Sequence, residues 1–139
     1  MTPEERLTRY AKLVVEIGAN VQPRQRVQVT ADIAHAPVVR AVTEQAYLSG
    51  ARRVDVEYFD RYVRRSMLQH APAETLTTAL DWELARLHEG ERDGMALIRL
   101  TGNPDPHLFD GIDPARVAAV PRELAMESRR IVQIGRAHV

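Results

Sequence analysis

The stretch from Arg26 to Tyr58 decides the fold and reads RVQVTADIAHAPVVRAVTEQAYLSGARRVDVEY. Residues 26–30 and 53–58 alternate polar and β-branched residues, which is typical of strands. The segment between them has Pro37 near its start, apolar residues at three- and four-residue spacing, and Gly50 at its end, which predicts a helix. A strand, a helix and a strand within about 30 residues predict a βαβ unit, with parallel strands and a right-handed crossover.

The rest of the chain continues this alternation. Thr2 is expected to cap the first helix, with Pro3 at its first position. A polar break is expected over 89–94, and Pro121 is expected to kink the last helix. The expected elements are helices over 2–17, 60–70, 72–88 and 113–131, and a largely apolar strand over 95–101 that is covered on both faces. The sequence therefore predicts an α/β fold with a mostly parallel sheet flanked by helices.

Composition narrows the class of protein. The 139 residues suffice for one domain, and 45% hydrophobic and 27% charged residues are ordinary for a soluble globular protein. No apolar run approaches the roughly 20 residues that cross a bilayer, and the N-terminus lacks a secretory signal. Cysteine is absent, which excludes disulfides and thiolate metal sites and fits a reducing compartment. We therefore expect a cytoplasmic protein without a membrane partner.

The charge pattern argues against nucleic-acid binding. Nineteen basic and nineteen acidic residues cancel, whereas nucleic-acid binding usually needs a concentrated basic face. The densest basic clusters each have acidic residues close by and are interpreted as solvated faces: Arg61, Arg64 and Arg65, then Arg129 and Arg130.

The histidines do not form a metal-binding pattern. A hydrolytic metal site needs three or four His, Asp or Glu side chains that converge on the ion. The histidines before residue 134 stand singly, and none has His-x-His or His-Glu-x-x-His spacing: they are His35, His70, His88 and His107. His35 and His107 follow predicted strands, where α/β proteins place ligand-contacting groups. A lone loop histidine is nevertheless more often a surface or capping residue, so no metal ligand is assigned.

Other residue types give no catalytic site. Asp81 and Glu83 flank Trp82, but residues two apart on a helix do not face each other, so they form a poor acid/base pair. Trp82 is better interpreted as a core or interface anchor. No serine lies in a Gly-x-Ser-x-Gly elbow, neither Ser49 nor Ser66 nor Ser128. No catalytic residue is therefore assigned, and substrate-binding residues stay unknown.

The sequence Gly102-Asn103-Pro104-Asp105-Pro106 is the most distinctive local motif. After a strand, it could present backbone N–H groups to an anion. Its two prolines remove two of those donors, and neither phosphate fingerprint is present. We interpret it as a rigid turn.

The last six residues, Ile134-Gly-Arg-Ala-His-Val139, interrupt a helical pattern. The codons ATC GGA AGA GCA CAC GTC encode them, and that string resembles a widely used sequencing adapter. We therefore expect residues 1–133 to be an N-terminal α/β domain of a truncated protein and residues 134–139 to be an adapter-derived tail. Under this interpretation His138 is no ligand candidate. A natural C-terminal tail is the alternative.

Several segments, in order over residues 5–133, together resemble the N-terminal region of the thermophilic metalloaminopeptidase family. They are residues 13–23 (LVVEIGANVQP), 27–30 (VQVT), 35–39 (HAPVV), 46–51 (AYLSGA), 54–58 (VDVEY) and 97–106 (LIRLTGNPDP). One departure is Arg24, where the family usually has glycine. A non-glycine residue there must avoid a left-handed conformation or carry strain.

The resemblance implies a larger two-domain enzyme whose N-terminal α/β domain precedes a catalytic domain. Members of the family release N-terminal amino acids from peptides with two divalent metal ions, commonly zinc or cobalt, and tend to form homodimers. Their metal ligands and acid/base residues lie in the C-terminal half, so none is carried over onto this sequence. The resemblance therefore implies that this fragment binds no catalytic metal and is inactive alone.

Two alternatives stay open. Some relatives of the family resemble iron-dependent ring-cleaving dioxygenases on a related scaffold, and this part of the sequence does not separate the two classes. A stand-alone, non-catalytic α/β ligand-binding module is the other alternative.

Overall fold

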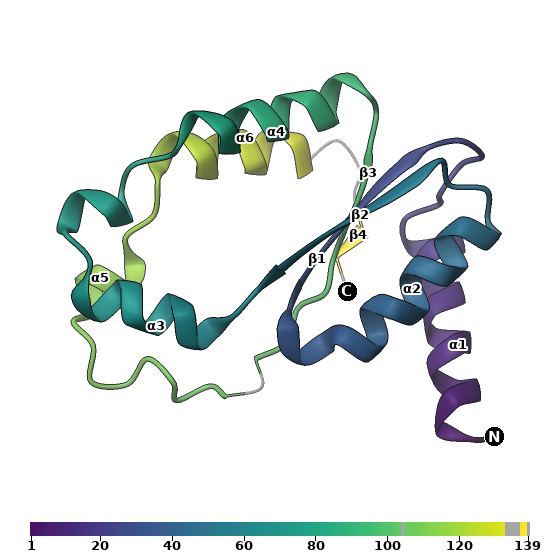
Figure 1. Ribbon diagram of the computed structural model, residues 1–139, viewed down its shortest axis with the longest axis horizontal. Coiled ribbons are helices and arrows are strands. Elements are labelled where there is room, and N and C mark those ends of the chain that lie inside the picture. The colour runs from purple at the N-terminus through teal and green to yellow at the C-terminus, as the bar shows by residue number, and fades with distance from the viewer. Residues whose placement is uncertain (104, 133–136, 139) are drawn as a thin grey trace.

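The computed structural model describes residues 1–103, 105–132 and 137–138. Figure 1 shows helices on both sides of one sheet. The helices are α1 (Pro3–Leu13), α2 (Ala36–Leu48), α3 (Arg61–His70), α4 (Asp81–Arg92), α5 (Pro114–Ala118) and α6 (Arg122–Val132). The strands are β1 (Arg26–Asp32), β2 (Arg53–Phe59), β3 (Ala96–Arg99) and β4 (Ala137–His138). Short irregular turns of helix cover Val14–Gly18, Ile33–His35 and Ala73–Leu76.

The strands form a parallel sheet in the order β2-β1-β3-β4. The chain moves from β1 outward to β2, then returns across β1 to β3. These two crossovers therefore place α2 and α4 on opposite faces of the sheet. Helix α1 packs beside α2, and α6 lies beside α4 (Figure 1). The predicted βαβ unit and the predicted α/β class are confirmed. Within the described residues, no helix is long and apolar enough to cross a membrane.

The main core lies between the sheet and the helices α1 and α2. Val27, Val29 and Ala31 alternate along β1 and are 0% exposed. They pack in one cluster with Ala11 of α1 and Val42 of α2. Each fully buried valine contributes roughly 1.5–3 kcal/mol. The alternate residues of β1 point to the opposite face of the sheet and are mostly polar.

A second, smaller core lies away from the sheet, beneath α3 and α5. It contains Leu68, Leu76 and Ile112. Arg116 of α5 donates hydrogen bonds of 2.6 Å to the carbonyl oxygens of Leu68 and Ala71, which satisfies the C-terminal end of α3. This core holds the long β2–β3 connection in place.

Two predicted helices have different boundaries in the structure. The expected helix over 72–88 is a short 3-10 turn followed by α4, which runs on through the expected polar break to Arg92. The Glu83 carboxylate accepts the N–H of Leu80 (3.0 Å) and so fixes a later start for α4. The expected helix over 113–131 is two helices rather than one kinked helix, because Pro121 disfavours helical backbone at the residue before it.

The first helix and the third strand also differ. The first helix has the predicted Thr2 cap, but residues 14–18 widen into a π-helical turn. The third strand spans only 96–99, and Arg99 at its end is exposed, so the strand is not covered on both faces. Trp82 is 60% exposed, so its interpretation as a core residue is wrong.

One buried ion pair ties the carboxyl ends of three strands together. Asp32 ends β1 and is 4% exposed. One of its oxygens caps the N–H of Ala34 (2.9 Å), and the other lies 3.0 Å from Nε of Arg61. The same guanidinium donates a 2.8 Å hydrogen bond to the carbonyl of Gly102, after β3, and lies 5.4 Å from the Phe59 ring centre at the end of β2. Arg61 thus holds the loops at this edge of the sheet.

Replacing Arg61 with Met should leave the buried Asp32 carboxylate without its cation. We expect the free energy of unfolding to fall by about 3 kcal/mol, because an unpaired buried charge is costly. Urea unfolding measures this loss. The double variant Asp32→Asn with Arg61→Met removes both charges and should recover part of it. Additive losses in the double variant would show that the two side chains do not stabilise each other.

The turn before β1 carries backbone strain at the position where the family resemblance expects glycine. Arg24 has φ of 65°, and its N–H donates a 2.7 Å hydrogen bond to the carbonyl of Gly50. A left-handed conformation costs a residue with a Cβ about 1–2 kcal/mol. Of the two outcomes expected for a non-glycine residue at position 24, the structure therefore shows the strained one: Arg24 adopts the left-handed conformation.

Replacing Arg24 with Gly should relieve this strain. We expect a net gain of about 0.5–1 kcal/mol in the free energy of unfolding, because the larger chain entropy of unfolded glycine offsets part of the relief. Arg24→Ala keeps the Cβ and serves as the matched control, with little change expected. Equal stabilities of the Gly and Ala variants in urea would contradict the strain assignment.

Candidate functional site

The carboxyl edge of the sheet is the first candidate site. Ligands of open α/β sheets bind outside the carboxyl ends of the strands, where the direction of winding reverses. That point lies between β1 and β3 here. The loops after β1, β2 and β3 bring together His35, Tyr62 and the turn that begins at Gly102.

The predicted turn at Gly102 meets one of the predicted candidate histidines. Nε2 of His35 lies 3.5 Å from the Gly102 carbonyl oxygen. Gly102 has φ of 129°, and a Cβ there would lie 3.5 Å from the same imidazole nitrogen. The Asn103 side chain accepts the N–H of Asp105 (3.1 Å), and the Tyr62 hydroxyl lies 3.5 Å from an Asp105 carboxylate oxygen. These contacts support the interpretation of a rigid turn; Pro104 lies outside the described residues.

The side chains of the remaining histidines are exposed or pair with other residues. His107 pairs with Asp110 (3.1 Å) on an exposed loop. His70 is exposed in the last turn of α3. His88 pairs with Glu127 (3.0 Å) and so joins α4 to α6. Hydrogen bonds from Arg130 and then from His88 hold the pKa of Glu127 below its usual value.

The donor set does not fit a metal centre. Across residues 1–103, 105–132 and 137–138, no three His, Asp or Glu side chains converge as ligands of one ion. Glu83 is engaged in capping α4, while Ser66 and Ser128 lie within α3 and α6. Ser49 is the C-cap of α2. Among the described residues, no metal ligand is therefore assigned. The predicted adapter-derived tail is described only in part. Its residues Ala137–His138 pair with β3, and residues 134–136 and 139 lie outside the described residues.

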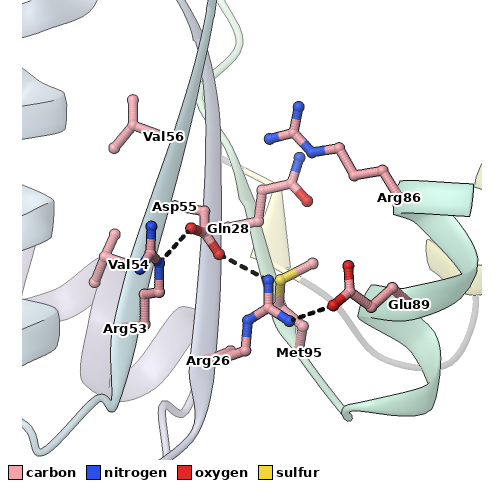
Figure 2. Close-up of a pocket in the computed structure, with 9 residues that line it drawn as sticks. All are labelled: Arg26, Gln28, Arg53, Val54, Asp55, Val56, Arg86, Glu89 and Met95. Carbon is pink, nitrogen blue, oxygen red and sulfur yellow. Dashed lines mark hydrogen bonds and ion pairs between the residues drawn. The ribbon is translucent and has the colours of Figure 1, made fainter. Parts of the chain in front are cut away.

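The second candidate site is a pocket of 420 Å³ between the polar face of the sheet and α4. Figure 2 shows Arg86 and Glu89 of α4 opposite the polar side chains of β1 and β2. The lining residues are Arg26, Gln28, Arg53, Val54, Asp55, Val56, Arg86, Glu89 and Met95.

An ion-pair network forms one wall of this pocket. Asp55 lies 2.8 Å from Nε of Arg53 and 3.0 Å from a terminal nitrogen of Arg26. Burial raises the pKa of Asp55, but hydrogen bonds from Arg53 and Arg26 outweigh it and leave the pKa below its usual value. Arg26 also reaches Asp93 (3.2 Å) and Glu89 (3.6 Å) at the end of α4. These ion pairs connect the C-terminal end of α4 to β1.

Sequence reasoning did not find this pocket. Its signal was present in the strands, because Arg26, Gln28, Asp55 and Glu57 occupy the alternate positions that share the polar face. The helix that completes the pocket is far along the chain, and local pattern gives no indication of which helix covers this face.

Comparisons with known proteins agree on one family. A sequence model of the thermophilic metalloprotease (M29) family matches residues 3–135. Aminopeptidase 2 of Geobacillus stearothermophilus is 32% identical over 122 residues, which cover 88% of this chain and 29% of that protein. Aminopeptidase AmpS of Bacillus subtilis is 36% identical over 115 residues, which cover 83% of this chain and 28% of that protein.

Comparison with solved structures points to the same family. The structure of wild-type AmpT from Thermus thermophilus superposes with a TM-score of 0.88 and 26% identity, over 99% of this chain and 36% of that chain. The present chain thus spans less than a third of the length of these two curated relatives. The expected family resemblance is confirmed: the chain belongs to the thermophilic metalloprotease (M29) family.

Proposed function

We propose that this chain is the N-terminal, non-catalytic part of a metal-dependent aminopeptidase that hydrolyses N-terminal residues from peptides. The family match over residues 3–135 carries the proposal. Relatives that match it are named aminopeptidases, and each extends far beyond the matched stretch. These names favour a peptidase over a ring-cleaving dioxygenase or a stand-alone binding module.

The residues that catalyse hydrolysis would then lie in other parts of the longer protein. In metal-dependent hydrolases, bound ions lower the pKa of a water and polarise the scissile carbonyl. We propose two divalent ions, zinc or cobalt, held by side chains of the longer protein, because the described donor set does not fit such a centre. The present residues would supply a rigid scaffold, with Arg61 and Asp32 fixing the loops at the carboxyl edge of the sheet.

The remaining properties of the longer protein follow from the same proposal. Peptides would be its substrates, and it would act as a homodimer in the cytoplasm. The chain contains no cysteine, which supports a reducing compartment.

A hybrid enzyme tests the proposal. Residues 3–135 of this chain would replace the matching stretch of Thermus thermophilus aminopeptidase T, to which the chain is 33% identical over 111 residues. We expect cobalt- or zinc-stimulated hydrolysis of leucine p-nitroanilide by the hybrid and none by the 139-residue chain. Circular dichroism would verify that both proteins are folded. Metal-stimulated turnover by the chain alone, or a folded hybrid without activity, would contradict the proposal.

A further inference from the structure

The outer edge of β2 carries unpaired main-chain groups. In a parallel ladder, alternate residues direct both N–H and C=O to the same side. The N–H of Val54 bonds the Tyr47 hydroxyl (2.9 Å) rather than β1, so Val54 faces outward. Val56 and Tyr58 follow at two-residue steps and face outward as well. No strand within the described residues pairs with this edge.

This edge is also partly exposed, and it carries only some of the usual protection. The side chains of Val56 and Tyr58 are 37% and 43% exposed. Proteins commonly block free edges with charged side chains, especially lysine, with proline or with a bulge. Charged residues are present in β2 at Arg53, Asp55 and Glu57. The strand Arg53–Phe59 has no proline or lysine, and its seven residues pair in continuous register with β1. An extended chain can therefore add to it.

The pocket on the polar face of the sheet borders two residues of the same strand. Val54 and Val56 both border it. Figure 2 shows their side chains pointing away from the other lining residues, so the two valines present main chain to the pocket. Arg53 from β2 and Arg86 from α4 supply positive charge beside that main chain.

Arg53 and Arg86 have guanidinium N–H donors that are available to a ligand. Arg53 uses Nε on Asp55 and is 72% exposed, and no hydrogen bond from its terminal nitrogens occurs in the described part of the chain. Arg86 lies 3.4 Å from Glu57 without forming a hydrogen bond. Arg26, by contrast, uses both terminal nitrogens on carboxylates. Guanidinium groups with free N–H donors bind carboxylates strongly.

We propose that the outer edge of β2 and this pocket form a binding site for an extended peptide with a free carboxylate. The peptide adds a strand beside Val56 and Tyr58, while its carboxylate meets Arg86 and Arg53. Main-chain pairing gives affinity without demanding particular side chains. This inference rests on the proposed function in one respect, namely that peptides are the substrates. It adds a binding site for the part of the peptide that lies far from the N-terminal residue to be released.

Nuclear magnetic resonance of the ¹⁵N-labelled 139-residue chain tests this site. The probe is the tetrapeptide Ala-Val-Ala-Ala at millimolar concentration, with its C-terminal amide for comparison. We expect the amide signals of Val56 and Tyr58 to shift, and the free-acid peptide to bind more tightly than the amide. Arg86→Gln should weaken binding of the acid about tenfold. Arg40→Gln, which removes the same charge from the exposed surface of α2, is the matched control and should leave binding unchanged.

A second variant separates binding from folding. Val56→Pro removes an N–H that faces outward, so the melting temperature should change little while peptide affinity falls. Absent shifts at β2, equal binding of acid and amide, or equal weakening by the Arg86 and Arg40 variants would overturn the site. Concentration-dependent dimerisation that protects the Val56 amide without peptide would overturn it too, because a second copy would then occupy the edge. Hydrolysis by the hybrid enzyme is a separate readout, so an active hybrid with no peptide binding at β2 refutes this site alone.

Discussion

The alternation of side chains along β1 is the constraint on which the structure depends. Val27, Val29 and Ala31 face α1 and α2 and are completely buried. Arg26, Gln28 and Asp32 face the other way and meet charged partners. A shift of one residue in the strand register would exchange these two faces and bury the charges. One central strand thus determines both the apolar core and the polar surface opposite it.

The two faces of the sheet are covered by different forces. Helices α1 and α2 pack on the first face by burial of apolar surface, which is insensitive to salt. On the second face, Met95 packs at Gly90 of α4. Ion pairs add to this contact: Arg26 and Arg52 reach Asp93, and Arg86 lies near Glu57. Ion pairs between partly exposed groups contribute little and are screened by salt.

Sequence reasoning succeeded where the signals were local. The βαβ unit, the Thr2 cap and the strain expected for a non-glycine residue at position 24 all depend on residues close in the chain. The predicted helix boundaries were wrong where a proline or a helix cap interrupted the periodic apolar pattern. Pro121 divides one predicted helix into two, and the cap before α4 gives that helix a later start. The ion pair of Asp32 with Arg61 and the pocket beneath α4 join residues 29 or more positions apart, and single-sequence patterns do not show such pairings. The candidate site was therefore less predictable than the fold.

The chain belongs to the thermophilic metalloprotease (M29) family, and within its described residues no three His, Asp or Glu side chains are placed to bind one metal ion. Our proposal is that the side chains that bind the catalytic ions lie outside this chain. Equilibrium dialysis of the folded 139-residue protein against micromolar zinc and cobalt, with bound metal counted by mass spectrometry, measures this directly. The account predicts no stoichiometric binding of either ion at neutral pH. Two ions, or one, retained per chain after dialysis against metal-free buffer would contradict it.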